Sequence, residues 1–247
     1  MRLALGENAA AVRMRHHHAV DLLPDELASS GVEHLTVDDI AAYERRRRFD
    51  PSGEIDLLRD LGLSGRDRIV ELGPGPGAFS LAAAEVAKEV VAVEPSLAMC
   101  SYLSQRAAAT GVDNLTIVNA GFLTYEHQGP PVGFAFSKNA LHHLPDFWKA
   151  EALGLIHRIL EPGGVLRLRD LVLSVPPDQA FERISAWIDD TASDEGWSRE
   201  ALVGHFRSEF STYTWILEAI LSAVGFDITD TEYADSGMFA RYTCRAV

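Results

Sequence analysis

The stretch RIVELGPGPGAFSLAAA, from Arg68 to Ala84, is the feature that most constrains the fold. A short apolar, β-rich run leads into three glycines, Gly73, Gly75 and Gly77, and then into an alanine-rich helical pattern. A strand, a glycine turn and a helix in this order let a ligand approach bare backbone near a helix N-terminus. The turn also satisfies the dinucleotide-binding fingerprint, with Ala78 at its last position. A turn that needs glycine only for packing is the alternative.

The chain after Asp67 alternates between β-rich and helical segments. This rhythm predicts βαβ units, and therefore an α/β fold whose parallel sheet is covered on both faces. Asp146 is expected to cap the helix that follows it, and a PGG turn at 162–164 to precede the fifth strand. Strands are expected at 68–72, 89–95, 114–120, 132–139, 165–174, 226–233 and 238–247, and helices at 77–88, 96–111, 147–160 and 212–225.

Two further regions break this rhythm. Residues 1–62 read as an N-terminal helical segment, with short helices at 24–28, 37–48 and 52–61, ahead of a main domain at 63–247. Residues 176–210 read as a helical, lid-like insertion with helices at 176–190 and 198–206. Trp187 and Trp197 in this insertion, with Tyr213 and Trp215 after it, are expected in the core, or to line an apolar substrate pocket if the insertion is a lid. Glu209 could reach a polar substrate group, but the solvated surface is favoured.

The charge balance restricts the partners of the chain. Its 36 acidic and 22 basic residues give a formal net charge of −14. Nucleic acids and anionic membranes both require basic surface, so neither is expected as the main partner. The two cysteines, Cys100 and Cys244, match neither a disulfide framework nor metal-ligand spacing, so no metal is expected. No stretch reads as a signal peptide or a membrane span, so a cytoplasmic location is expected.

Two carboxylates indicate which cofactor the turn accepts. Glu71 precedes the turn and would repel a pyrophosphate, and Pro74 and Pro76 remove two backbone donors that phosphates use. S-adenosylmethionine instead brings an ammonium and a sulfonium, which a glutamate attracts. Glu94 ends the second strand, 21 residues after Gly73, where a carboxylate can accept both ribose hydroxyls.

At this point the sequence resembles the class I S-adenosylmethionine-dependent methyltransferases, from about Ala41 to the C-terminus. The segments that carry the resemblance, in order, are VELGPGPGAFS, VVAVEPS, IVNAGFLTY, SKNALHHLPD, RILEPGGVLRLRD and LSAVGFDI. The resemblance implies a Rossmann-like, doubly wound sheet of seven strands, mostly parallel, with the last strand antiparallel. It also implies that S-adenosyl-L-methionine is the cofactor.

The resemblance further assigns cofactor contacts. Glu71 and the turn from Gly73 to Gly77 would hold the methionine part, and Glu94 the ribose. Many relatives carry an aspartate that faces the adenine amino group, but Gly121 stands in that place here, and Phe122 is left to stack on the ring. The full set of candidate cofactor residues is Glu71, Gly73, Gly75, Gly77, Glu94, Pro95, Gly121, Phe122, Ser137 and Asn139.

Three residues are candidates for the chemistry. His142 and His143 follow the fourth strand, at the edge where open α/β sheets bind ligands, and a histidine can serve as general base for an oxygen nucleophile. Asp170 lies near the end of the fifth strand and can orient such a histidine. Packing and helix capping are the alternative roles for this segment.

The sequence thus predicts a methyltransferase of small molecules, with a secondary-metabolite acceptor and O-methylation favoured. Alternatives remain: a protein as methyl acceptor, C- or N-methylation, a protein that binds S-adenosylmethionine without methyl transfer, and an NAD-dependent oxidoreductase. The expected partner is a small-molecule methyl acceptor, and the sequence leaves a homodimer open.

Overall fold

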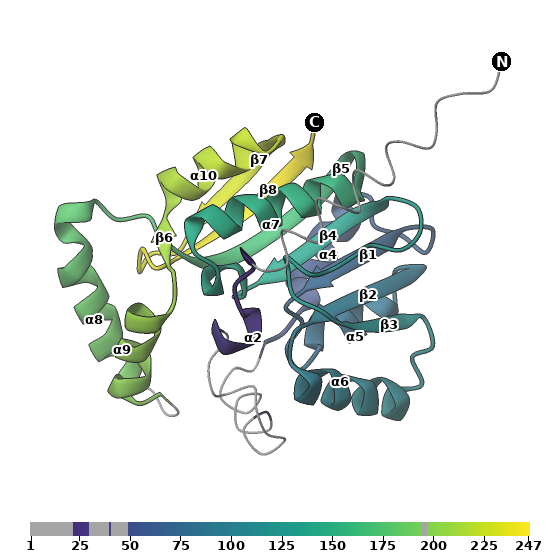
Figure 1. The fold of residues 1–247 in the computed structure, drawn as a ribbon, viewed down its shortest axis with the longest axis horizontal. Coiled ribbons are helices and arrows are strands. Elements are labelled where there is room, and N and C mark those ends of the chain that lie inside the picture. Colours follow the sequence, from purple (N-terminus) through teal and green to yellow (C-terminus); the bar gives the residue numbers. More distant parts are fainter. Residues whose placement is uncertain (1–21, 30–39, 41–48, 194–196) are drawn as a thin grey trace.

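The computed structural model describes residues 22–29, 40, 49–193 and 197–247, so most of the helix expected at 37–48 lies outside it. The sheet has the strand order β3-β2-β1-β4-β5-β8-β7 (Figure 1), and the short strand β6 pairs with β5. Strands β1 to β5 are parallel neighbours, whereas β8 runs antiparallel to both β5 and β7. This confirms the predicted Rossmann-like sheet. The strands are β1 (Arg68–Leu72), β2 (Glu89–Glu94), β3 (Leu115–Asn119), β4 (Val132–Lys138), β5 (Leu160–Leu173), β6 (Thr212–Tyr213), β7 (Phe226–Tyr233) and β8 (Phe239–Ala246).

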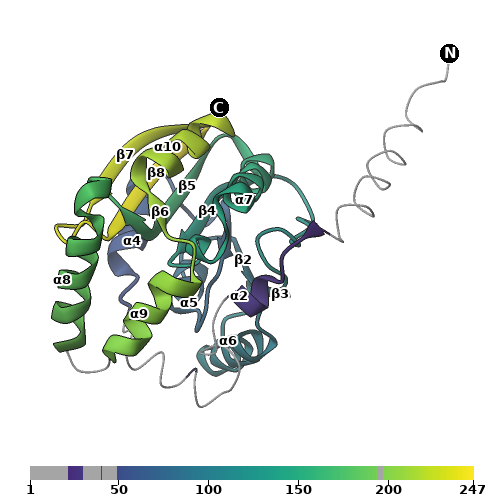
Figure 2. The same cartoon turned by 60° about the vertical axis from the view of Figure 1, so that its left-hand side comes forward.

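Helices cover both faces of the sheet (Figures 1 and 2). Successive strand residues point to opposite faces, so Val70 of β1 packs with α7 (Asp146–Ile159) and α10 (Thr214–Ala223), while Ile69 packs with α4 (Ser52–Asp60) and α5 (Ala78–Ala84). Helix α6 (Leu97–Thr110) packs on β2 and β3. Both faces of β1 are therefore buried, as a parallel sheet requires.

The N-terminal segment contributes to this core. Ile55 and Leu58 of α4 are buried in the same cluster as Phe79 of α5. Glu54 of α4 accepts a 2.8 Å hydrogen bond from Nε of Arg167 on β5, and both side chains are buried. The short helix α2 (Glu26–Ser29) lies near the end of β3 (Figure 2).

The insertion forms two helices, α8 (Ala180–Ser193) and α9 (Arg199–Ser208), which stand beside each other at one side of the sheet (Figure 1). Ser198 caps α9, since its hydroxyl accepts from the Ala201 amide at 3.1 Å. A separate apolar cluster, which includes Ala180 and Met238, packs under the helices.

Four local predictions were wrong. Residues 212–225 were expected to form one helix, but Thr212–Tyr213 is strand β6 and α10 begins at Thr214, so the sheet has eight strands rather than seven. Pro145, not Asp146, is the cap residue of α7, and Asp146 instead accepts from Lys149 and Thr212. Strand β5 begins at Leu160 rather than after the PGG turn, with a register shift against β4. Helix α5 ends at Ala84, four residues early. Among the described residues, no helix has the length and apolarity to cross a membrane.

Candidate functional site

The glycine turn follows β1 directly. Gly73, Gly75 and Gly77 have φ angles of 74°, 52° and 82°, a region that residues with side chains rarely adopt. A Cβ at Gly73 would lie 2.4 Å from Cβ of Ala140, and one at Gly77 would lie 2.0 Å from Cδ1 of Leu103. The protein's own packing therefore requires two of these glycines, whatever binds at the turn.

Two buried carboxylates surround the turn at the ends of β1 and β2. Glu94 accepts from the Gly75 amide at 3.2 Å and from the Ser96 amide at 2.9 Å, so it ties the turn to the start of α6. Glu71 accepts a short hydrogen bond from the Ser80 hydroxyl of α5. Each carboxylate is at least 94% buried, which is unusual for an acid without a cationic partner.

Burial raises the pKa of both carboxyl groups to about 7. For Glu71, the Ser80 hydroxyl and the positive charge of Lys138 lower the pKa, and the charge of Glu94 raises it. A cation bound at the turn would favour the ionised form of both groups. The site is therefore suited to a ligand that is positively charged on this side.

The loop after β3, where the adenine is expected, contains a contact that the sequence did not reveal. Glu26 of α2 accepts from the amides of Phe122 and Leu123 at 2.7 and 3.0 Å, and burial raises its pKa. A Cβ at Gly121 would lie 2.3 Å from the carboxyl carbon of Glu26. The carboxylate of Glu26 thus fills the space that a side chain at position 121 would need.

The other candidate cofactor residues have structural contacts of their own. Pro95 accepts from the Asn119 side chain at 2.9 Å, and Ser137 donates to the Leu72 carbonyl at 2.9 Å. Asn139 has a φ of 50°, and its buried Oδ1 has no hydrogen-bond partner in the described part of the chain. The cofactor roles of all ten residues stay predictions.

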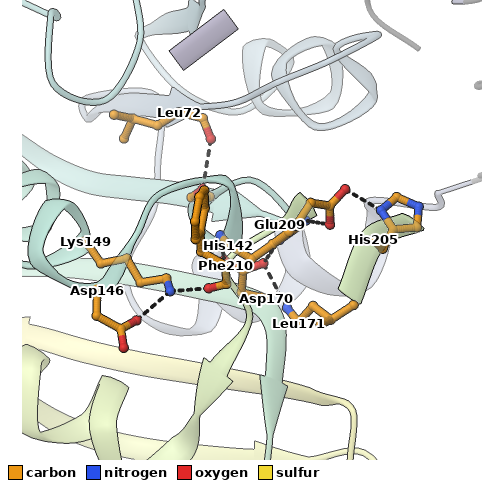
Figure 3. A network of polar contacts seen from close by, with 10 residues as sticks. Leu72, His142, Asp146, Lys149, Asp170, Leu171, His205, Glu209 and Phe210 are labelled. Atoms are coloured by element: carbon orange, nitrogen blue, oxygen red, sulfur yellow. Dashed lines mark hydrogen bonds and ion pairs between the residues drawn. The ribbon is translucent and has the colours of Figure 1, made fainter. Parts of the chain in front are cut away.

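The structure brings His142 and Asp170 together. His142 lies in a 3-10 turn after β4 (Leu141–His143), and its amide donates to Oδ2 of Asp170 at 2.8 Å. Its Nδ1 makes a short hydrogen bond to Oδ1 of the same carboxylate, which also accepts from the Leu171 amide (Figure 3). The His143 ring lies 4.3 Å from the His142 ring, centre to centre. His142 is therefore the histidine that Asp170 orients.

A second carboxylate lies on the other side of His142, where the sequence analysis did not expect one. Nε2 of His142 is 3.1 Å from Oε2 of Glu209, whose other oxygen makes a short contact with Nδ1 of His205 (Figure 3). Backbone contacts fix this position: the Phe210 amide donates to the His142 carbonyl at 2.8 Å, and Lys149 donates to the Phe210 carbonyl. The expectation that Glu209 is solvated was wrong, since only 8% of its side chain is exposed.

This arrangement sets the charge of His142. Burial by itself would lower the pKa of the imidazole, but Asp170 and Glu209 outweigh burial and raise the pKa to about 9. The hydrogen bonds and charges of His142 and His205 likewise hold the pKa of Glu209 well below its usual range, although burial opposes them. The raised pKa therefore favours the imidazolium form of His142 between the two carboxylates at neutral pH.

A cavity of about 420 Å³ opens beside this network. Its walls come from the ends of β4 and β5, from the insertion and from the segment before α4. It adjoins the glycine turn, since Gly73 packs on Ala140 and the neighbouring Asn139 lines the cavity. The lining residues are Phe49, Asp50, Lys138, Asn139, His142, Arg169, Leu171, Trp187, Thr191, Trp197, Leu202, His205, Glu209 and Phe239.

Donor atoms of His142, His143 and Glu209 lie within 4.8 Å of one another, a spacing that a metal ion can use after some contraction. However, Nε2 of His142 already faces Glu209, so an ion would have to displace that contact. The absence of a metal stays a prediction.

Comparison with known proteins agrees with this geometry. A family model described as a methyltransferase domain matches residues 69–164. An uncharacterised methyltransferase of Exiguobacterium sibiricum is 27% identical over 84% of this chain and 89% of its own. One of Oceanobacillus iheyensis is 27% identical over 46% of this chain, and the match spans only about half, 51%, of that relative.

Solved structures share the fold. A Bacillus halodurans protein, provisionally assigned as a methyltransferase, has a TM-score of 0.61 at 14% identity over 78% of this chain and 98% of its own. The [4+2]-cyclase SpnF has a TM-score of 0.58 at 17% identity, covering 77% and 80%. The N-methyltransferase NodS of Bradyrhizobium japonicum, solved with S-adenosylhomocysteine, has a TM-score of 0.55 at 14% identity, covering 79% and 86%.

The family match over residues 69–164 and the relatives support a class I S-adenosylmethionine-dependent methyltransferase, and the solved structures share its fold. The family uses S-adenosylmethionine as its methyl donor, so the turn after β1 and its two buried carboxylates are where we expect that cofactor.

Proposed function

We propose that this protein transfers a methyl group from S-adenosylmethionine to an oxygen of a small molecule, with His142 as the general base. The observation that carries the proposal is the contact between His142 and Asp170, which holds the Nε2 side of the imidazole toward a cavity next to the cofactor turn. A cavity of about 420 Å³ is within the usual range for a small ligand.

The proposed reaction is an in-line displacement. The acceptor oxygen forms a bond to the methyl carbon while the carbon–sulfur bond breaks, and its electron pair goes to sulfur, which leaves as the neutral thioether. The acceptor proton goes to Nε2 of His142, and Asp170 stabilises the imidazolium that results. Because Glu209 lies 3.1 Å from Nε2, the acceptor hydroxyl takes the place of Glu209 when it binds.

Glu71 and Glu94 are proposed to bind the two ends of the donor. Glu71 lies where the cationic methionine part is expected, and Glu94, at the end of β2, accepts hydrogen bonds from ribose hydroxyls. The alternative of an NAD-dependent enzyme is disfavoured, since a diphosphate would lie against these buried acids.

The test is a methyl-transfer assay on phenols, alcohols and amines with methyl-labelled S-adenosylmethionine. We expect transfer to oxygen, with kcat/KM rising with pH up to about 9, because this profile reports the free enzyme. His142→Gln should remove this pH dependence of kcat/KM. His157→Gln, at the distant end of α7, should leave it unchanged.

Two related structures have other activities, a cyclase and an N-methyltransferase. Transfer to amines with a flat profile between about pH 6 and 9 would favour N-methylation. Binding of S-adenosylhomocysteine without transfer to any acceptor would favour a protein that does not methylate.

A further inference from the structure

Three basic residues form a row across the sheet at the edge of the cavity. Lys138 of β4 is the register partner of Arg169 of β5, and Arg169 is the partner of Arg241 of β8. Partners on neighbouring strands project from the same face, and like charges placed directly opposite repel each other. Such a row is unexpected in a chain whose net charge is −14, where carboxylates to separate the cations are plentiful.

The two ends of the row have partners within the protein. Arg241 forms an ion pair with Glu232 of β7. Nζ of Lys138 lies 4.3 Å from the centre of the Phe49 ring, and its charge lowers the pKa of Glu71.

Arg169, in the middle of the row, is different. Its side chain makes no ion pair or hydrogen bond with any residue that the structure describes, and its Nε is buried without a partner. Burial and the charge of Arg241 lower its pKa, and the charges of Glu54 and Glu232, which raise it, do not outweigh them. A buried donor of a charged group that lacks an acceptor is costly, so the fold keeps an unfavourable group at this position.

The surroundings of Arg169 indicate which chemical group its guanidinium binds. Arg169 and Lys138 line the cavity together with the aromatic side chains of Trp187, Trp197 and Phe239. The carboxylate of Glu209 in the same cavity is engaged by His142 and His205. The lining also includes the carboxylate of Asp50, but Arg169 forms no ion pair with it or with any other carboxylate in the described part of the chain. A planar carboxylate is the group that the donors of its guanidinium match best.

We propose that the methyl acceptor is a flat, largely apolar molecule that carries a carboxylate, and that Arg169 binds this carboxylate while Lys138 adds to the positive field. The aromatic walls bury the body of the molecule, and the reacting oxygen faces His142. The identification of the bound molecule as the methyl acceptor rests on the proposed function. The anion subsite itself does not depend on methyl transfer.

The proposal is tested with two probes of nearly the same shape, the anionic 1-naphthoate and the neutral 1-naphthamide. Binding to the full chain is followed by calorimetry and by quenching of tryptophan fluorescence, since Trp187 and Trp197 line the cavity. Naphthoate should bind at least about tenfold more tightly than naphthamide, the effect of one charge-assisted interaction. Arg169→Met should remove this preference, and Arg169→Lys should keep part of it.

Arg199→Met is the matched control. Arg199 pairs with Asp189 on the exposed surface of the insertion, so the preference for naphthoate should survive there. Thermal unfolding separates binding from folding: Arg169→Met should be at least as stable as the wild type, because it removes repulsion within the row. A structural arginine would instead lower the melting temperature when replaced.

Equal binding of the two probes to the wild type, no naphthoate binding up to its solubility limit, or a preference that survives in Arg169→Met would each overturn the proposal. Titration with S-adenosylhomocysteine is done separately. If that ligand fails to bind while Arg169 still selects naphthoate, the proposed function is wrong and the anion subsite stands. If it binds and no selection is found, the subsite is wrong.

Discussion

The charge of His142 is the most informative quantity to perturb, because two carboxylates act on it through different atoms. Asp170 contacts Nδ1 and Glu209 lies 3.1 Å from Nε2. The change is Glu209→Gln, which keeps the size of the side chain and removes its charge. An opposite charge at this distance typically shifts a pKa by about 1–3 units, so the pKa of His142 should fall from about 9 to between roughly 6 and 8.

The assay is NMR titration of the imidazole Cε1 resonance in protein labelled with ¹³C-histidine. His142→Gln assigns the signal, and His157 serves as an internal reference. Glu200→Gln, on the exposed side of α9, the helix that ends just before Glu209, is the matched control and should leave the midpoint at about 9. A wild-type midpoint near 6.5, or an unchanged midpoint in Glu209→Gln, would refute the reasoning.

Three further outcomes follow from the described contacts. The pKa of His142 in the folded protein lies above its unfolded value of about 6.5, so its stabilising contribution is complete below pH 6.5 and is lost as pH rises to about 9. The free energy of unfolding, measured by urea denaturation, should fall by up to about 3 kcal/mol over this window. The fall should be clearly smaller in His142→Gln. The pKa of Glu71 is raised to about 7, so the affinity for S-adenosylhomocysteine should increase from pH 6 to 8. Binding should release protons, and calorimetry in two buffers of different ionisation enthalpy measures this release. Glu71→Gln should reduce the number of protons released. Glu26→Ala and Gly121→Ala should each lower the free energy of unfolding by about 1–3 kcal/mol, because a Cβ at position 121 expels the Glu26 carboxylate. The two effects should not add in a double-mutant cycle, and full additivity would show that the two residues act independently.

Much of the fold was predictable because its signals are local. The alternation of β-rich and helical segments, with glycine stops such as Gly111 at a φ of 73°, predicted seven of the eight strands and their order along the chain; only the short strand β6 was missed. Errors of a few residues arose where tertiary contacts override local preference. Asp146, for example, bonds to Lys149 and Thr212 instead of capping α7.

The candidate site was predictable where neighbouring parallel strands end at one edge of the sheet. A contact between Asp170 of β5 and a histidine after β4 was expected on this ground, but the sequence did not distinguish His142 from His143. Glu209 was missed because its position depends on a long-range contact. The neighbouring residue Phe210 donates a backbone hydrogen bond to His142, 68 positions earlier in the chain. Glu26 was missed for the same reason: no local pattern links α2 to the loop after β3.

The central claim is that the turn after β1, with Glu71 and Glu94, binds a cationic, phosphate-free adenosyl cofactor. The most direct test is calorimetric titration of the purified chain with S-adenosylmethionine, S-adenosylhomocysteine and NAD. The account predicts that the first two bind with one site per chain, that NAD does not bind, and that Glu94→Ala weakens binding of both adenosyl ligands. Binding of NAD alone would contradict it.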